Sequence, residues 1–362
     1  MTPDTPTGEI WILGAAGRIG SAVAARLAAQ GFTPVLVGRG KEALSRTAVN
    51  LGPGAGAKVV VTGSVDDIAA EVARQRPAVV VNTIGNFAET APPIARACLR
   101  GGGHYVDMAA DLVALPRLLS LHDEASAAGS TLVTGAGFGV LATEAVVAKL
   151  CENRPTPERV RVDALGSVAT DAGTVGAAFA ASIVNVIATG GRAYEEGRLV
   201  TRRLGADPQD LTLPDGETVK SAGAPSGELM AAQRASGAPS VTVTTALAPT
   251  SAVARAVLPL AGKLLSIPRL QRFAVRRMAG VRTKAAPRPR RHSWGHAVVI
   301  WSDGTRREGW LRADDGMDYT AAVAAETAAA LARGEGKPGA YTPAAVLGPD
   351  LAVAAGGTFV LD

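Results

Sequence analysis

WILGAAGRIGSAVAARLAAQG, residues 11–31, decides how the first part of this chain folds. A short apolar run ends at Gly14, Gly17 and Gly20 follow at three-residue intervals, and an Ala-rich stretch with helical spacing comes next. Three glycines in this context allow a sharp turn after a strand, a close backbone approach to a pyrophosphate, and tight packing of a helix on the strand. A purely structural glycine turn is the alternative, but the strand–turn–helix context favours a dinucleotide-binding loop.

The residues from Glu9 to Gly139 continue this pattern, because short apolar runs alternate with Ala-rich helical stretches. Such alternation is typical of βαβ units in a parallel sheet that is covered on both faces. We therefore predict that residues 1–140 form a Rossmann domain with a doubly wound α/β sheet. The predicted strands are residues 10–13, 34–37, 58–61, 78–83, 104–107 and 131–134, and the predicted helices are residues 19–30, 41–50, 65–75, 91–100 and 116–128.

Beyond Cys151 the pattern changes to longer alternating strands such as SVTVTTAL and HAVVIWSDGTRREGWLRA. These predict a second, α+β domain over residues 141–315, built on a mostly antiparallel sheet. Its helix TVGAAFAASIVNVIATGG has small residues that would line an apolar cavity or simply permit tight packing. Residues 201–238 and 282–294 are interpreted as loops because they are rich in Pro, Gly or charge. A last helix is expected over residues 319–333.

The second predicted strand is followed by Arg39, where NAD-specific proteins usually carry an acid for the ribose 2′-hydroxyl. An arginine there favours the 2′-phosphate of NADP, and Arg18 in the glycine loop would add a second positive group. Either arginine is alternatively an ordinary exposed side chain. The candidate cofactor-binding residues are Gly14, Ala16, Gly17, Arg18, Ile19, Gly20, Arg39, Ser64, Thr83, Ile84 and Gly85.

The carboxyl ends of the fourth and fifth predicted strands carry the candidate catalytic residues Asn86, Tyr105 and Asp107. Tyr105 and Asp107 alternate on one strand and so point to the same face. A tyrosine there would donate a proton, and an aspartate would orient substrate or relay one. Alternatively, Tyr105 is a core aromatic with a satisfied hydroxyl, and Asp107 caps the next loop. His104 is interpreted as structural.

Composition and charge narrow the classes of partner. The two cysteines, Cys98 and Cys151, form no metal-ligand spacing, so we expect neither a disulfide framework nor a metal site. The N-terminus lacks the pattern of a signal peptide and no apolar run is long enough to span a membrane, so we expect a cytoplasmic protein.

The positive charge of the chain, +5 in total, is concentrated between Arg255 and Arg291, a segment that holds eleven Lys or Arg and no acid. This segment is a solvated face or a peripheral contact for an anionic surface. Nucleic acid is not expected, because aromatic residues are few.

Several motifs together resemble the saccharopine dehydrogenase-like family, including its trans-acting enoyl reductase branch. They are the opening glycine loop with Gly38-Arg39, VVNTIGNF, ACLRGGGHYVDMAAD, VTGAGFGVLATEAVV and the C-terminal GMDYTAAVAAETAAALARGEGKPGAYTPAAVLG. The resemblance implies NADP binding, an inserted α/β domain, a homodimer formed through the second domain, and a C-terminal helix and tail, residues 316–362, that return to the Rossmann domain. Around the expected substrate cleft, Gly85-Asn86-Phe87 and Ala109-Ala110-Asp111 depart from the family pattern, which weakens the inference of a lysine-pathway reaction.

Two classes of function remain open at this point. The first is an NADPH-dependent oxidoreductase that reduces a polarised C=N or C=C bond of a small or carrier-linked metabolite. The second is a non-catalytic NADP-binding sensor or partner-binding module. Turnover distinguishes them, because an enzyme oxidises NADPH with some acceptor and a sensor only binds it.

Overall fold

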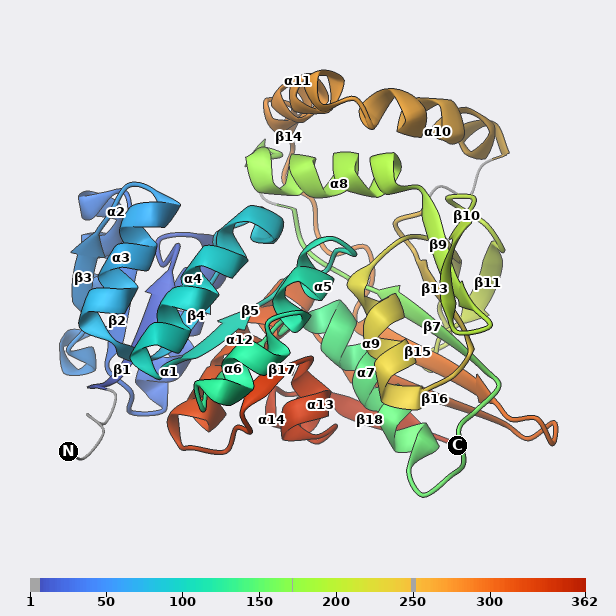
Figure 1. Cartoon of the computed structure of the whole chain (residues 1–362). Coiled ribbons are helices and arrows are strands. Elements are labelled where there is room, and N and C mark those ends of the chain that lie inside the picture. Colours follow the sequence, from blue (N-terminus) through green and yellow to red (C-terminus); the bar gives the residue numbers. More distant parts are fainter. Residues whose placement is uncertain (1–6, 171, 249–251) are drawn as a thin grey trace. The chain divides into compact units, whose positions relative to one another are not determined.

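The structure is a computed structural model that describes residues 7–170, 172–248 and 252–362 (Figure 1). Its internal contacts divide the chain into two compact units. The first comprises Met1–Ala109, Val113–Gly137 and Met317–Ala355, and the second comprises Ala110–Leu112, Phe138–Gly316 and Gly356–Asp362. One unit contains a parallel sheet and the other a mixed sheet, so the predicted α/β class is confirmed.

The sheet of the first unit has seven parallel strands in the order β17-β6-β5-β4-β1-β2-β3. The strands are β1 (Thr7–Leu13), β2 (Pro34–Gly38), β3 (Lys58–Val61), β4 (Pro77–Asn82), β5 (His104–Asp107), β6 (Thr131–Val133) and β17 (Gly339–Tyr341). The chain runs outward from β1 to β3 and then crosses to β4 on the other side of β1. This reversal is the point at which doubly wound sheets bind ligands, beyond the carboxyl ends of the strands.

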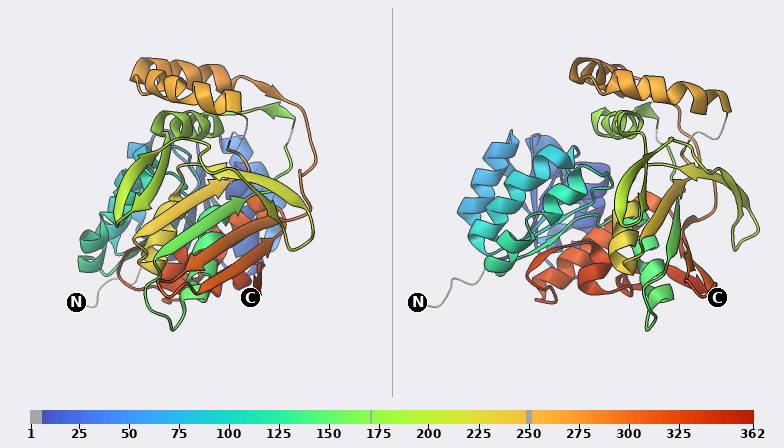
Figure 2. Two further views of the ribbon diagram at one scale, coloured as in Figure 1. Left: turned by 90° about the vertical axis from the view of Figure 1, so that its right-hand side faces the viewer. Right: turned by 45° about the vertical axis from the view of Figure 1, so that its right-hand side comes forward.

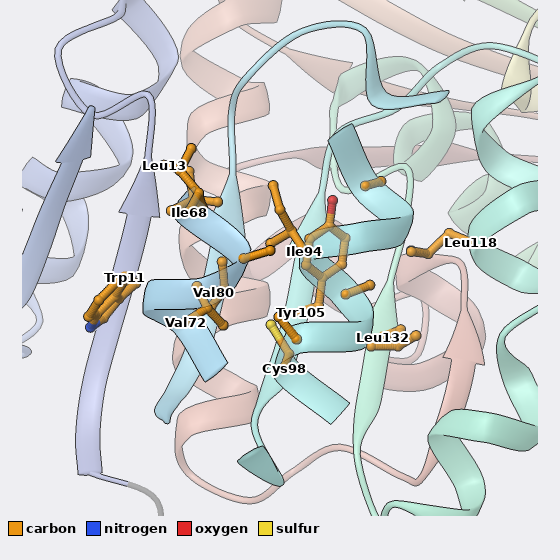
Figure 3. Close-up of a cluster of buried hydrophobic side chains, with 14 of the residues drawn as sticks. Trp11, Leu13, Ile68, Val72, Val80, Ile94, Cys98, Tyr105, Leu118 and Leu132 are labelled. Carbon is orange, nitrogen blue, oxygen red and sulfur yellow. The ribbon is translucent and has the colours of Figure 1, made fainter. Parts of the chain in front are cut away.

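Helices cover both faces of this sheet. They are α1 (Arg18–Ala29), α2 (Lys41–Asn50), α3 (Val65–Gln75), α4 (Phe87–Gly101), α5 (Ala114–Leu119), α6 (His122–Ala127), α12 (Gly316–Ala332), α13 (Pro343–Leu347) and α14 (Leu351–Ala354), with a short 3-10 turn at Pro53–Ala55. Helix α4 packs against both α3 and α5, and the apolar side chains of the three helices join alternate residues of the strands in one buried cluster (Figure 3). Gln30, the C-cap residue of α1, donates to the side chain of Glu326 on α12.

The second unit contains a nine-stranded mixed sheet with the order β10-β9-β13-β7-β15-β16-β18, to which β12 and β11 are attached through β13. Neighbouring strands are antiparallel except β13 and β7, which are parallel. The strands are β7 (Arg159–Leu165), β9 (Gly191–Glu195), β10 (Arg198–Arg202), β11 (Gln209–Thr212), β12 (Thr218–Gly223), β13 (Ser240–Thr245), β15 (Ser293–Ile300), β16 (Arg306–Ala313) and β18 (Thr358–Leu361). Two further strands, β8 (Gly173–Thr174) and β14 (Arg282–Thr283), pair with each other.

Two groups of helices belong to the second unit. Helices α7 (Phe138–Cys151) and α9 (Gly227–Ser236) pack on each other and on the mixed sheet. Helix α8 (Ala177–Thr189) packs instead against α10 (Ala252–Leu265) and α11 (Pro268–Ala279). Figures 1 and 2 show α10 and α11 in orange, lying together over α8.

The interpretation of residues 201–238 as a loop was wrong, because this stretch contains β11, β12 and α9. The two strands form a hairpin whose turn includes Gly216 with φ of +86°. Most residues of the hairpin are exposed and polar, so the stretch lacks the alternating apolar pattern from which strands are predicted. The predicted loop over 282–294 is mostly correct, since only the short strand β14 at Arg282–Thr283 and the start of β15 at Ser293 fall within it.

Within the described residues, none of the helices combines the length and apolar character needed to cross a bilayer. The same part of the chain contains no cluster of three or more His, Cys, Asp or Glu side chains that could hold a metal ion.

Candidate functional site

The loop between β1 and α1 requires glycine at particular positions. Gly14 has φ of +76°, and a Cβ atom there would lie 2.7 Å from Oγ1 of Thr83. A Cβ atom on Gly20 would lie 2.4 Å from the backbone oxygen of Gly14, so the third glycine lets α1 pack directly on the loop. Gly17 is the N-cap residue of α1 and makes no side-chain cap. These are the roles that the glycine spacing predicts.

The first turn of α1 is suited to an anion. It contains no acidic residue, and Ala16 and Gly17 are exposed at its start. Backbone N–H groups at a helix N-terminus, together with the helix dipole, favour negative charge such as a pyrophosphate.

An open pocket of about 680 Å³ extends from this loop across the ends of the neighbouring strands. Of the residues predicted to bind cofactor, six line it: Gly14, Ala16, Gly17, Arg39, Ser64 and Ile84. Six others line it that we did not predict: Gly38, Gly40, Thr62, Gly63, Val65 and Ile68. Arg39 is the one charged side chain among these described lining residues, and it is exposed directly after β2. The pocket therefore presents a cation and no acid where a 2′-phosphate would bind.

The remaining predicted cofactor residues lie outside the pocket lining, although some of them support it. Thr83 donates from Oγ1 to the backbone oxygen of Leu13 at 2.7 Å, which joins the ends of β4 and β1. Gly20 is buried beneath the loop, whereas Arg18 is exposed on the first turn of α1. The other two, Ile19 and Gly85, are half-buried.

Ser64 has a second role besides lining the pocket. Its Oγ accepts from the N–H of Asp67 at 3.1 Å, and the Asp67 side chain accepts from the N–H of Ser64 at 3.2 Å. This capping box begins α3. The sequence Thr62-Gly63-Ser64 after β3 could have predicted this side of the pocket, because small residues in a turn permit close approach of a ligand.

The side chains of Tyr105 and Asp107 are brought together as predicted, but inside the protein. Both are fully buried, and Tyr105 lies in the apolar cluster of Figure 3. The Tyr105 hydroxyl donates to Oδ2 of Asp107 at 3.1 Å and accepts from Nδ2 of Asn82 at 2.9 Å. Thr134 donates to Oδ1 of the same aspartate at 2.7 Å. This geometry favours the interpretation in which Tyr105 is a core aromatic with a satisfied hydroxyl.

Burial sets the ionisation of this network. It raises the pKa of Asp107 to about 6, although hydrogen bonds from the N–H of Ala109 and from Thr134 and Tyr105 act in the opposite direction. Burial and the neighbouring Asp107 raise the pKa of Tyr105 well above its ordinary value. The tyrosine thus keeps its proton, and the aspartate titrates close to neutral pH.

The other two polar residues at these strand ends are placed differently. Asn86 is exposed at the start of α4 with φ of +60°, and its amide donates to Oε2 of Glu89 at 2.6 Å. His104 accepts at Nδ1 from the N–H of Thr131 at 2.9 Å, and burial lowers its pKa. The histidine is therefore a structural residue, as interpreted from the sequence, while Asn86 is accessible to a ligand.

A second buried polar cluster lies in the mixed sheet. His296 on β15 bonds Oδ2 of Asp163 on β7 at 2.8 Å and Oε1 of Glu308 on β16 at 2.9 Å. Arg161 forms an ion pair with Asp163 at 2.9 Å, and the His296 ring stacks on Trp310 with centroids 3.7 Å apart. Both imidazole nitrogens of His296 are occupied and the ring is buried, so this histidine stabilises the sheet and offers no free nitrogen to a ligand.

Comparison with known proteins indicates the same kind of ligand as the pocket does. Residues 10–133 match the family model described as the saccharopine dehydrogenase NADP binding domain. This match confirms the resemblance over residues 10–133 and identifies NADP as the cofactor. The residues present fit it, since the loop glycines leave no room for side chains, the first turn of α1 carries no acid, and Arg39 supplies a cation.

Two curated relatives are trans-acting enoyl reductases. The one from Mycobacterium leprae is 30% identical over 224 residues, which cover 59% of this chain and 51% of the relative. The one from Mycobacterium tuberculosis is 27% identical over 154 residues, covering 41% of this chain and 37% of the relative. The chain thus spans about half, or less, of the length of the relatives it matches.

A solved structure of a short-chain dehydrogenase from Sphingobium yanoikuyae in complex with NADPH also resembles part of the chain. It is 20% identical, has a TM-score of 0.28, and is matched over 35% of this chain and 70% of that chain. A TM-score this low carries no argument about function.

Proposed function

We propose that this chain, whose residues 10–133 match the saccharopine dehydrogenase NADP binding domain, is an NADPH-dependent reductase. Its substrate would be a polarised C=N or C=C bond of a small or carrier-linked metabolite. The observation that carries the proposal is the pocket beside the glycine loop, with Arg39 and no described acid in its lining. The names of the curated relatives support an enoyl group as the acceptor.

The residues of the chain divide into binding and positioning roles in this proposal. Arg39 holds the 2′-phosphate, and the first turn of α1 holds the pyrophosphate. When bound, NADPH supplies the hydride. Asn86, exposed after β4, orients the substrate, and the network of Asn82, Tyr105 and Asp107 fixes the ends of β4 and β5.

The proposal is tested by following NADPH oxidation with a panel of enoyl thioesters and imines. We expect turnover with at least one acceptor class, and a fall in kcat/KM for Asn86→Ala without loss of NADPH binding. Absence of turnover with every acceptor, despite tight NADPH binding, would contradict the reductase and support the sensor.

The sensor is the second candidate because both Tyr105 and Asp107 are fully buried. A Tyr105→Phe variant distinguishes their possible roles. A positioning role predicts a loss of stability of about 1–3 kcal/mol, because polar groups of Asn82 and Asp107 lose a buried partner. A role in proton supply predicts in addition a fall in kcat of about 100-fold or more.

A homodimer and a cytoplasmic location belong to the same proposal. Sedimentation velocity measures the first, and cell fractionation measures the second. A monomer at all concentrations would remove the dimer from the proposal without affecting the reductase.

A further inference from the structure

Helices α10 and α11 carry apolar side chains that the fold leaves exposed. The exposed fraction is 64% for Leu260, 50% for Leu264 and 64% for Phe273. Isolated exposed apolar residues are ordinary, but a cluster of them marks an interaction surface. Seven large apolar side chains that are exposed in the described part of the chain fall within one short stretch: Val257, Leu260, Leu264, Ile267, Leu270, Phe273 and Val281.

The opposite sides of the same helices are used for packing on α8. A Cβ atom on Gly262 would lie 2.8 Å from the backbone oxygen of Ile187, so α10 approaches α8 closely at this point. On α11, Gln271 donates from Nε2 to Oδ1 of Asn185 at 2.8 Å. Figure 2 shows α10 and α11 as an outer layer on α8. The exposed apolar residues therefore lie on a second face, which we call the α10–α11 surface.

The charge around this surface has one sign. Residues 255–291 contain eleven Lys or Arg and no Asp or Glu; the side chain of Arg255 lies outside the described residues. On α11, the exposed Arg269 and Arg276 share a helix face with Phe273 because they are four and three residues from it. The exposed Arg272 is in turn three residues from Arg269 and four from Arg276. Within the described part of the chain, neither these arginines nor Arg277 enter an ion pair with an acid.

A pocket beside α10 has the same mixed character. Its volume is about 650 Å³, and it combines apolar walls from Ile187 and Leu258 with three cations, Arg202, Arg203 and Lys263, and one acid, Asp207. An apolar wall bordered by cations suits an amphiphile that carries an anionic head.

We propose that the α10–α11 surface docks on an anionic lipid bilayer. The aliphatic and aromatic side chains enter the boundary between headgroups and acyl chains, while the arginines contact the anionic headgroups. A second copy of the chain fits poorly, because two such surfaces would bring cations against cations. The docking surface is independent of the reductase proposal, since it uses none of the residues around the NADP pocket.

The test is flotation of the full chain with vesicles of phosphatidylcholine alone or mixed with phosphatidylglycerol. We expect binding to the anionic vesicles only, and loss of binding at high salt. The triple variant Arg269→Gln, Arg272→Gln, Arg276→Gln should reduce partitioning about 100-fold, because each basic residue contributes about fivefold near an anionic surface. The variant Leu260→Ser, Leu264→Ser, Phe273→Ser should reduce it about tenfold or more, since apolar burial is lost.

Two control variants carry the same kinds of substitution at exposed residues outside the α10–α11 surface. Arg46→Gln, Arg100→Gln, Arg198→Gln removes three exposed cations, and Val49→Ser, Leu199→Ser, Val353→Ser removes three exposed apolar side chains. Both controls should bind as the unaltered chain does, and NADPH titration of every variant verifies that it is folded. Equal loss in controls and test variants, or no binding to anionic vesicles, would overturn the proposal. So would a lipid-free dimer that the test variants convert to monomer, because the surface would then be a self-interface.

Discussion

Gly20 illustrates at the residue scale how the loop after β1 depends on the absence of a side chain. A Cβ atom there would meet the backbone oxygen of Gly14 at 2.4 Å and the Cα of Ala15 at 2.8 Å. Backbone atoms cannot rotate away as a flexible side chain can, so either α1 or the loop would have to move. The loop that would hold the pyrophosphate is thereby tied to the position of α1.

We predict that Gly20→Ala lowers the free energy of unfolding by about 1–3 kcal/mol, the usual cost of overpacking. It should also weaken NADPH binding, because the loop is displaced. Urea unfolding and NADPH titration measure the two effects. Gly54→Ala is the matched control, since nothing lies within 4 Å of the added Cβ atom there. Equal stability of the two variants would contradict the account.

The sequence predicted some of these residues well and others poorly. The glycine loop and Arg39 were sufficient to predict four of the twelve residues that line the pocket, because close backbone approach requires glycine and a phosphate requires a cation. Strand alternation correctly placed Tyr105 and Asp107 on one face. It could not show that Asn82 of β4 completes their network, because that contact depends on which strands are neighbours and how they are aligned.

At the scale of elements, the alignment of β7, β15 and β16 creates the cluster around His296. This residue is paired with Asp163 on one side and with Trp310 on the other. Asp163 is 133 residues from His296 in the sequence, so no spacing rule indicated that these two residues meet. The hairpin of β11 and β12 was missed for a related reason, since its identity as strands depends on the sheet to which it attaches.

The ionisation of this cluster makes stability depend on pH. Burial by itself would raise the pKa of Asp163, but its hydrogen bonds with His296 and Arg161 lower it to about 2. Burial by itself would lower the pKa of His296, yet the hydrogen bonds to Asp163 and Glu308 raise it. Asp163 thus contributes stability that is present above its ordinary pKa of 3.8 and is lost as pH falls towards 2. His296 contributes stability that is present below 6.5 and is lost as pH rises through its elevated pKa.

We predict that His296→Ala destabilises the chain by about 3–5 kcal/mol near neutral pH, because Asp163 and Glu308 lose a buried partner. The free energy of unfolding of the variant should also no longer fall as the pH rises above neutral, because the histidine that loses its proton in the unaltered chain is absent. Chemical unfolding across a pH series measures both effects. His292→Ala is the control, because its partner Asp314 is exposed and such pairs contribute about 0–1 kcal/mol. A decline with pH that persists unchanged in His296→Ala would refute this assignment.

At the scale of the whole molecule, the last part of the chain completes a unit that the first part begins. Strand β17 pairs with β6 in parallel, and Gln30 at the C-terminal end of α1 donates to the side chain of Glu326 on α12. Helix α12 is rich in fully buried alanines, which let it pack closely: Ala321, Ala324, Ala325, Ala328 and Ala329. From the sequence alone, only the family resemblance implied that residues 316–362 return to the Rossmann domain. Pairing between strands so far apart in the chain leaves no local pattern in the sequence.

Ala328→Leu should therefore destabilise the first unit by about 1–3 kcal/mol through overpacking. Thermal unfolding with and without NADPH measures the loss of stability, and the midpoint temperature of unfolding should fall in both conditions. Ala25→Leu on the exposed side of α1 is the control and should leave the midpoint nearly unchanged. An Ala328→Leu variant as stable as this control would show that α12 does not pack as described.

The central claim is that the pocket beside the glycine loop binds NADP and that Arg39 recognises its 2′-phosphate. Calorimetric titration with NADPH and NADH tests it most directly, with Arg39→Ala and, as a control that removes an exposed arginine of α2 outside the pocket, Arg46→Ala. We predict that the unaltered chain binds NADPH more tightly than NADH. Arg39→Ala should weaken the affinity for NADPH by about 10- to 100-fold, because a charge-assisted contact is lost, and should leave the affinity for NADH unchanged. Arg46→Ala should leave both affinities unchanged. Binding of neither nucleotide, or NADPH affinity that Arg39→Ala leaves intact, would contradict the claim.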